Sequence, residues 1–191
     1  MSIDLKRLTY DVYLAMPEMK QRYSILDGEL VMAASPNPPH QTIVLEIAMK
    51  LAPFVRERQL GRVFVAPLDI VIRREPLRTR QPDVMFIGRE QRFIIGPQVI
   101  EGAPDLVIEV LSPTNTRREL QGKLDDYRTI GVREAWVVSP EARTVEVLQL
   151  TPGAIQRLGL YGLGDLLASQ VLPDLRLTVD DIFPEFDFAR S

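Results

Sequence analysis

The chain has 191 residues, of which 46% are hydrophobic and 26% charged, and its formal net charge is -3. This composition and length suit one globular domain with its own core. The absence of cysteine excludes disulfide scaffolds, thiolate metal sites and cysteine nucleophiles, and a single histidine, His40, excludes two-histidine metal motifs. Since no apolar run suits a membrane helix or a signal peptide, we expect a cytoplasmic protein with no membrane partner.

The first third of the chain is predicted to form a helix, a hairpin and a longer helix. In chain order the elements are a helix over residues 8–15, strands over 22–27 and 29–34, a loop over 35–39 and a helix over 40–58. Asp27-Gly28 between the two strands is a strong hairpin signal. Pro53 lies inside the longer helix and predicts a kink or an early end there.

The rest of the chain is predicted to form strands around another helix. In chain order we expect an extended stretch over residues 61–74, a polar turn over 73–81, a strand over 83–87, a long connection over 88–104, a strand over 105–111, a helix from residue 116 to 130, strands over 135–139 and 144–150, and an apolar stretch over 172–183. Thr116 and Glu119 have the spacing of a capping box, and Gly131 is expected to end the helix. The order predicts a mixed α/β fold, a sheet with helices on its faces.

Arginine is concentrated in one part of the chain. Residues 56–92 contain nine arginines and five acidic residues, although the whole chain is negatively charged. Such a mixed-sign stretch is most often a solvated surface, and it is also a surface that a polyanion can contact. Charge alone therefore does not decide whether the protein binds nucleic acid.

Two carboxylates interrupt strands that are otherwise apolar. Glu109 lies within the run 106–111, and Asp83 begins the run 83–87. A buried carboxylate is costly unless it is paired or bound to a metal. If these strands pair antiparallel, Asp83 lies near Glu109, and Asp105 lies about 13 Å away at the far end as a turn or cap residue. The alternative is that Glu109 lies at an exposed strand end or pairs with an arginine.

Helical projection places further polar residues on apolar faces. Lys123 falls within the stripe that contains Tyr127, in a chain with four lysines and nineteen arginines. Such a lysine either extends outward along its methylene groups or meets a carboxylate. His40 aligns with the apolar face of its helix, where a lone histidine is more often a hydrogen-bonded core residue than a catalyst. Glu46 lies beside that face, either near a site or in solvent.

An aspartate and a glutamate from adjacent strands, with a lysine from the next helix, form a site for a hard cation. Carboxylate oxygens suit Mg²⁺ or Mn²⁺, and a water on such a metal can attack phosphorus. A nearby lysine can stabilise charge on the phosphate. The pattern predicts metal-assisted phosphodiester hydrolysis, with Asp83 and Glu109 as metal ligands and Lys123 as the third catalytic residue. A buried ion-pair network without catalysis has the same pattern.

Motifs along nearly the whole chain resemble those of the Uma-type family, which is assigned to the PD-(D/E)XK restriction-endonuclease-like superfamily. The matching strings are Asp27-Gly28-Glu29, Ser35-Pro36 with His40, Pro82-Asp83, Pro104-Asp105 through Glu109 to Ser112-Pro113, Lys123 with Tyr127, Gly131-Val132 through Trp136, and Leu172-Pro173. The resemblance implies a restriction-endonuclease-like fold, with a central mixed sheet flanked by helices. It implies one domain over residues 1–191, with a helix and hairpin over 1–35, a nuclease core over 40–150 and a C-terminal extension over 151–191.

The resemblance also implies roles for the candidate site residues. Asp83 matches the first aspartate of the superfamily motif, and Glu109 matches its second acidic residue. Leu111 stands where the motif has lysine, and Lys123 fits a lysine that has moved to the next helix. Glu46 matches an extra carboxylate of the first helix in parts of the superfamily.

His40, Asp105 and Tyr127 are further candidates for accessory roles at this site, and the role of His40 is not assigned by the resemblance. The leading hypothesis is a Mg²⁺- or Mn²⁺-dependent endonuclease that acts on DNA. By resemblance to superfamily members that cut two strands as symmetric pairs, we expect a homodimer.

Two alternatives stay open. The absence of lysine at position 111 and the acidic net charge favour a degenerate nuclease fold that binds nucleic acid or a protein partner. The other alternative is a purely structural ion pair between Lys123 and Glu109, in a domain that acts through its surface.

Overall fold

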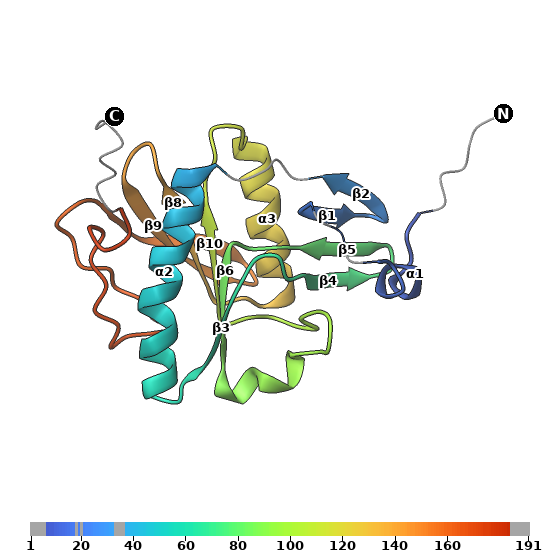
Figure 1. The fold of residues 1–191 in the computed structure, drawn as a ribbon, viewed down its shortest axis with the longest axis horizontal. Helices are drawn as coiled ribbons and strands as arrows, with labels where there is room; N and C mark the ends of the chain where they lie inside the picture. Colours follow the sequence, from blue (N-terminus) through green and yellow to red (C-terminus); the bar gives the residue numbers. More distant parts are fainter. Residues whose placement is uncertain (1–6, 18, 20, 33–36, 184–191) are drawn as a thin grey trace.

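The computed structural model describes residues 7–17, 19, 21–32 and 37–183, and its elements follow the predicted order of helix, strands, helix and strands (Figure 1). They are α1 (Tyr10–Leu14), β1 (Tyr23–Leu26), β2 (Glu29–Met32), α2 (Pro38–Glu57), β3 (Gly61–Val65), β4 (Ile70–Arg74), β5 (Leu77–Arg80), β6 (Val84–Gly88), the 3₁₀ helix η1 (Arg89–Ile94), β7 (Leu106–Val110), α3 (Arg117–Ile130), β8 (Glu134–Ser139), β9 (Thr144–Thr151) and β10 (Ala154–Tyr161). None of the described helices is long and apolar enough to cross a membrane.

The central sheet has six strands in the order β10-β9-β8-β7-β6-β3. Within it, β7 and β8 are parallel, and the other neighbouring strands are antiparallel. Parallel neighbours need a crossover connection, and α3 provides it between β7 and β8. The predicted mixed sheet flanked by helices is confirmed.

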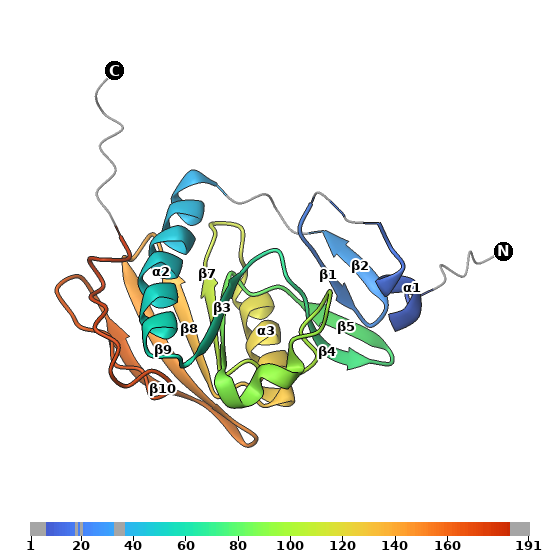
Figure 2. The same cartoon turned by 60° about the horizontal axis from the view of Figure 1, so that its bottom comes forward.

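The two faces of the sheet are covered by different elements (Figure 2). Val84, Ile108 and Trp136 lie on the face that packs against α2 and the segment 167–183. Met85 and Val107 lie on the opposite face, which packs against α3. Because both faces are buried, β6 and β7 are nearly continuous apolar runs, and a carboxylate in them must find partners inside the protein.

Caps mark the ends of the two long helices, and the predicted ends of α3 are confirmed. Asn37 caps α2 by accepting the His40 backbone N–H at 2.9 Å, so the helix begins at Pro38, before the predicted start at residue 40. The early end predicted at Pro53 is wrong, because the helix continues to Glu57. Thr116 and Glu119 form the predicted capping box of α3, and Gly131 ends it with a φ of 97°. These caps satisfy backbone groups that a helix end leaves unpaired, which is why local sequence signals find them.

The N-terminal hairpin is also confirmed. Asp27 and Gly28 have φ angles of 54° and 85°, as a two-residue hairpin turn of this kind requires. The last residues of the predicted second strand and the start of the predicted loop, at 33–36, lie outside the described residues. The hairpin lies beside β4 and β5 in both views, and the Ile25 N–H donates to Thr79 Oγ1 at 3.1 Å (Figures 1 and 2).

The structure corrects the prediction for residues 61–81. The extended stretch 61–74 is two strands, because β3 belongs to the central sheet and β4 to a separate two-stranded sheet. The predicted polar turn over 73–81 contains β5, which pairs antiparallel with β4. Arg78 and Arg80 in β5 form ion pairs with Asp126, and charged residues of this kind give no hydrophobic strand signal.

The C-terminal prediction omitted β10, which pairs antiparallel with β9 at the edge of the central sheet. An edge strand has less of its surface covered by the core than a central strand has. Its sequence therefore lacks the clear alternation of apolar and polar residues. In β10 the pattern is further interrupted by a register shift between Arg157 and Gly159.

Candidate active site

The two carboxylates predicted from the apolar strands lie on neighbouring strands of the central sheet. The antiparallel register of β6 and β7 pairs Val84 with Ile108, so that Asp83 and Glu109 are the next residues along the two strands. Asp83 and Glu109 are each 3% exposed. The prediction that antiparallel pairing brings these carboxylates to the same end of two strands is therefore confirmed.

Asp83 is surrounded by donors from three separate elements. Its Oδ1 accepts from Arg22 Nη1 at 2.7 Å, and its Oδ2 accepts from the Val110 backbone N–H at 2.8 Å. His40 Nε2, in the first turn of α2, lies 3.3 Å from the same Oδ2. Burial raises the pKa of Asp83. The His40 imidazole, the Arg22 charge and the Val110 N–H lower it by more than burial raises it. The net pKa of Asp83 is lowered, so this carboxyl stays ionised.

Arg22 is the site residue that sequence reasoning missed. It also donates from Nη2 to the Gln81 carbonyl at 2.9 Å, which fixes its guanidinium over the start of β6. Arg22 lies 61 positions before Asp83 in the chain, just ahead of β1. No local motif indicates such a pairing, because the fold alone brings the hairpin next to β6.

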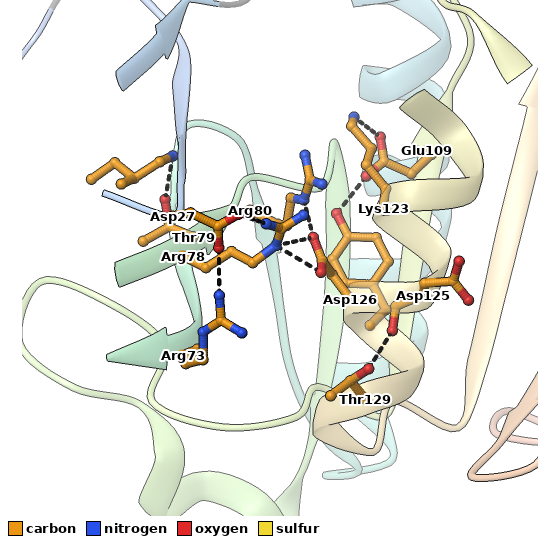
Figure 3. Close-up of polar contacts among 12 residues, drawn as sticks. Asp27, Arg73, Arg78, Thr79, Arg80, Glu109, Lys123, Asp125, Asp126 and Thr129 are labelled. Atoms are coloured by element: carbon orange, nitrogen blue, oxygen red, sulfur yellow. Dashed lines mark hydrogen bonds and ion pairs between the residues drawn. The ribbon is translucent and has the colours of Figure 1, made fainter. Parts of the chain in front are cut away.

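Glu109 is held by two residues of α3. Its Oε2 accepts from Lys123 Nζ at 2.6 Å (Figure 3), and its Oε1 accepts from the Tyr127 hydroxyl at 2.5 Å. Burial and the neighbouring Glu109 raise the pKa of Tyr127, so its phenol stays protonated and donates. Of the two alternatives for Lys123, the one in which it meets a carboxylate is correct. The alternative of an exposed Glu109 at a strand end is wrong.

A cavity of about 590 Å³ opens beside these side chains. Its lining includes Arg22, His40, Gln81, Asp83 and Lys123. Glu109 is not among the lining residues, and its side chain is joined to one of them, Lys123, by the hydrogen bond described above. The cavity therefore brings together residues from the N-terminal hairpin, α2, the end of β7 and α3.

Two other candidates lie away from this cavity. Asp105 is at the opposite end of the paired strands, where its Oδ2 accepts the Gly88 N–H at 2.7 Å and its Oδ1 lies 3.3 Å from Arg133. It is thus a cap residue, as its spacing from Glu109 predicts. Glu46 is half-buried on α2, and no ion pair or hydrogen bond joins its side chain to the rest of the described chain. The structure does not bring Glu46 to the site.

Unpaired buried polar atoms gather around the cavity. Within the described residues, four buried side-chain atoms lack a hydrogen-bond partner: Arg22 Nε, His40 Nδ1, Gln81 Oε1 and Asp69 Oδ1. The first three belong to residues that line the cavity. Buried polar groups are nearly always paired in folded proteins, so a cluster of unpaired ones indicates a place where a ligand or water completes the bonding.

The donor set fits a hard divalent cation. The carboxylates of Asp83 and Glu109 keep free lone pairs, and Gln81 Oε1 is an unpaired amide oxygen beside the same cavity. Mg²⁺ is usually bound by one or two carboxylates together with water and substrate phosphates. The described residues contain no group of three or more histidine, aspartate or glutamate side chains that could hold a metal alone.

Comparison with known proteins agrees with this fold. Residues 10–180 match the model of the Uma2 family, which carries the description "Putative restriction endonuclease". An uncharacterized protein of Synechocystis sp. is 29% identical over 126 residues, which are 65% of this chain and 70% of that protein. A crystal structure from Anabaena variabilis, described as that of a "putative nuclease", has a TM-score of 0.76 at 20% identity and covers 92% of this chain and 97% of its own. The chain has the fold of that nuclease-like protein and belongs to the Uma2 family of restriction-endonuclease-like proteins.

Proposed function

We propose that this protein is a divalent-metal-dependent endonuclease that hydrolyses phosphodiester bonds in DNA. Membership of the Uma2 family and the shared fold support a nuclease in general terms. The observation that carries the finer proposal is the joint placement of Asp83, Glu109 and Lys123. Two buried carboxylates lie at the same end of adjacent strands, and the Lys123 amine is 2.6 Å from the second one.

Lys123 takes the place of the lysine of the superfamily motif, which this chain lacks. Leu111 occupies the position of the motif lysine directly after β7, and its side chain packs against the core cluster on the α3 face. Lys123 reaches the same carboxylate from α3, one turn before Tyr127. The amine is therefore supplied from a different element while the chemistry stays the same.

Asp83 and Glu109 would hold Mg²⁺ or Mn²⁺, which when bound acts as a Lewis acid and lowers the pKa of a bound water. Arg22 and His40 keep Asp83 ionised, and Tyr127 fixes the orientation of Glu109. Lys123 stabilises the negative charge that builds up on the phosphate oxygens. A water oxygen bonds to phosphorus and gives up a proton to solvent, one P–O ester bond breaks, and the leaving oxygen takes up a proton from solvent.

The wall of the cavity suits a polyanionic substrate. Arg22, Arg80 and Lys123 line it. Cationic side chains of this kind bind the phosphate backbone of DNA without regard to sequence. We also propose that the protein forms the homodimer that the resemblance implies. Light scattering of the purified protein tests this, because it measures the mass of the particle in solution.

The proposal is tested by cleavage of supercoiled, linear and single-stranded DNA with Mg²⁺, with Mn²⁺ and with a chelator. We expect metal-dependent cutting that falls about 100-fold or more in Glu109→Gln and in Lys123→Met. Lys50→Met is the matched control, because Lys50 is also a helical lysine that pairs with a carboxylate, Asp181, at 2.6 Å. Circular dichroism verifies that each variant is folded.

Undiminished cutting by folded Glu109→Gln would contradict the proposed active site. A second function is favoured by one observation, since both carboxylates are already paired with donors from Arg22, Lys123 and Tyr127. Such pairing suits a fold that binds DNA without cutting it. DNA affinity that survives both the chelator and Glu109→Gln, with no cutting by the unmodified chain, would support this binding function.

A further inference from the structure

The arginine-rich stretch over residues 56–92 divides into two groups in the structure. Four of its nine arginines lie in β4 and β5 and pair with carboxylates of other elements. The other five form no ion pair within the described ranges of the chain. These five are Arg56, Arg58, Arg62, Arg89 and Arg92. The fold therefore neutralises one group and leaves the other available to a partner.

The five unpaired arginines gather at one end of the central sheet, and we call them the arginine patch. They come from the C-terminal end of α2, from β3 and from η1. The Arg89 N–H donates to the Leu60 carbonyl at 2.7 Å, and Arg62 is opposite Ile87 in the register of β3 and β6. These contacts hold η1 against the turn that follows α2, and both views show these parts of the chain close together (Figures 1 and 2).

The arginine patch is exposed and strongly positive. All five of its arginines are exposed, and the only acidic residues in the segments 56–62 and 88–93 are Glu57 and Glu90. Like charges on one surface repel each other, so a negatively charged partner is favoured there. A phosphate backbone is such a partner, because arginine binds phosphate through paired N–H bonds.

An exposed aromatic ring lies within the same surface. Phe93 directly follows Arg92 in η1 and is 79% exposed, the largest exposed fraction among the large hydrophobic residues that the structure describes. Unpaired bases stack on such rings in proteins that bind single strands. A single ring among arginines suits one base, whereas binding to a membrane surface needs a wider apolar face.

We infer that the arginine patch and Phe93 bind single-stranded nucleic acid, with the guanidinium groups on the phosphates and the ring against an unpaired base. Asp83 precedes β6, and the patch lies at the other end of this strand, whose five residues span about 17 Å. The patch is thus a second surface, away from the cavity of the candidate active site. The inference goes beyond the proposed function, because binding there does not require cutting.

The inference is tested by fluorescence anisotropy of a labelled oligothymidine strand, with a chelator present so that no metal-dependent cutting occurs. We expect the double variant Arg62→Gln/Arg89→Gln to weaken binding about tenfold or more. It should also reduce the slope of log affinity against log salt concentration by about 1.4, since each phosphate contact with a single strand contributes about 0.7. Phe93→Ala should weaken binding about tenfold and leave the slope unchanged.

Arg73→Gln/Arg74→Gln is the matched control. Both arginines are exposed and lie in the same arginine-rich stretch, and the charge change is the same, but each is already paired with a carboxylate. This variant should keep the affinity and the slope of the unmodified chain. With a DNA duplex, whose bases are already stacked, Phe93→Ala should have no effect. Circular dichroism verifies that each variant is folded.

Unchanged affinity in Arg62→Gln/Arg89→Gln, or an equal loss in the control, would overturn the inference. Binding to phosphatidylserine vesicles that this variant loses, without binding of the oligonucleotide, would overturn it in favour of a membrane surface. Loss of oligonucleotide affinity in this variant, together with no DNA cutting by the unmodified chain, supports the inference and overturns the proposed function alone. Metal-dependent cutting, with oligonucleotide affinity that this variant keeps, would overturn the inference alone.

Discussion

Asp83 is the residue at which the N-terminal hairpin, α2 and the central sheet meet. Arg22, His40 and the Val110 N–H all contact its carboxylate, although it is almost fully buried. Burial alone would favour the neutral acid, and these three groups reverse that preference. The result is a carboxylate that is ionised before any ligand arrives.

The lowered pKa of Asp83 predicts how stability depends on pH. Because the pKa is lower in the folded chain than in the unfolded chain, the unfolded state takes up more protons in acid. The stabilisation is fully present above about pH 4 and is lost as the pH falls through the folded-state pKa. We expect Asp83→Asn to lower the free energy of unfolding at neutral pH by about 2 kcal/mol and to flatten its fall in acid.

Urea unfolding at a series of pH values, followed by the fluorescence of the buried Trp136, measures this effect. Asp174→Asn, in which an exposed carboxylate is replaced, serves as the control and should keep the acid dependence. If the free energy of unfolding fell as steeply in acid for Asp83→Asn as for the unmodified chain, other carboxylates would account for the acid dependence, and the prediction would be wrong.

At the scale of elements, one ionic network fixes α3 against the strands beside it (Figure 3). Asp126 on α3 accepts from Arg78 Nε at 2.8 and 2.9 Å and from Arg80 Nε at 2.6 Å. Arg78 also pairs with Asp27 in the hairpin turn at 3.1 Å, and Arg73 pairs with the same aspartate. The network joins the hairpin, β4, β5 and α3, so it sets the direction in which α3 presents its inner face.

Asp126→Asn is expected to lower the free energy of unfolding by about 1–3 kcal/mol, because two partly buried arginines lose their charged acceptor. The adjacent Asp125→Asn is the matched control, since Asp125 is half exposed and its ion pair with Arg128 spans 3.5 Å. It should change stability by about 0.5 kcal/mol or less. Equal effects of the two substitutions in urea unfolding would refute an anchoring role for Asp126.

At the scale of the whole molecule, Glu134 attaches the C-terminal segment to the central sheet. It is 1% exposed at the start of β8 and accepts from Trp136 Nε1 at 2.8 Å. It also accepts from Ser169 Oγ at 2.6 Å and from the backbone N–H groups of Gln170 and Val171 at 2.7 and 3.3 Å. One carboxylate therefore satisfies donors of the segment whose leucines complete the core under α2.

Glu134→Gln is expected to lower the free energy of unfolding by about 2 kcal/mol or more, because an amide group would face donors that need acceptors. We also expect faster proteolysis between residues 162 and 171, measured by mass spectrometry of the fragments. Glu146→Gln on the neighbouring β9 is the control, since Glu146 is only half-buried and pairs with exposed Arg157 at 3.5 Å. Similar proteolysis of the two variants would argue against this attachment.

The parts of the fold that could be predicted are those with local signals. The capping box at Thr116, the Asp27-Gly28 turn and the apolar runs of β6 and β7 each depend on a few neighbouring residues. The inward direction of Lys123 follows from helical geometry, and its pairing with Glu109 agrees with it. β5 was missed because its arginines are neutralised by Asp126 on a distant helix, which hydropathy does not reveal.

The amino-acid sequence by itself determined the order of the helices and of the apolar strands, the ends of α3 and the presence of two carboxylates and a lysine in apolar surroundings. It did so because capping, turn geometry and hydrophobic periodicity act over a few residues. Only the tertiary structure decided that Arg22 pairs with Asp83 and that Asp126 on α3 pairs with Arg78 and Arg80 of β5. Partners that lie tens of positions apart leave no periodic pattern in the chain. Their contacts arise only when the packed hairpin, strands and helices bring them within hydrogen-bonding distance.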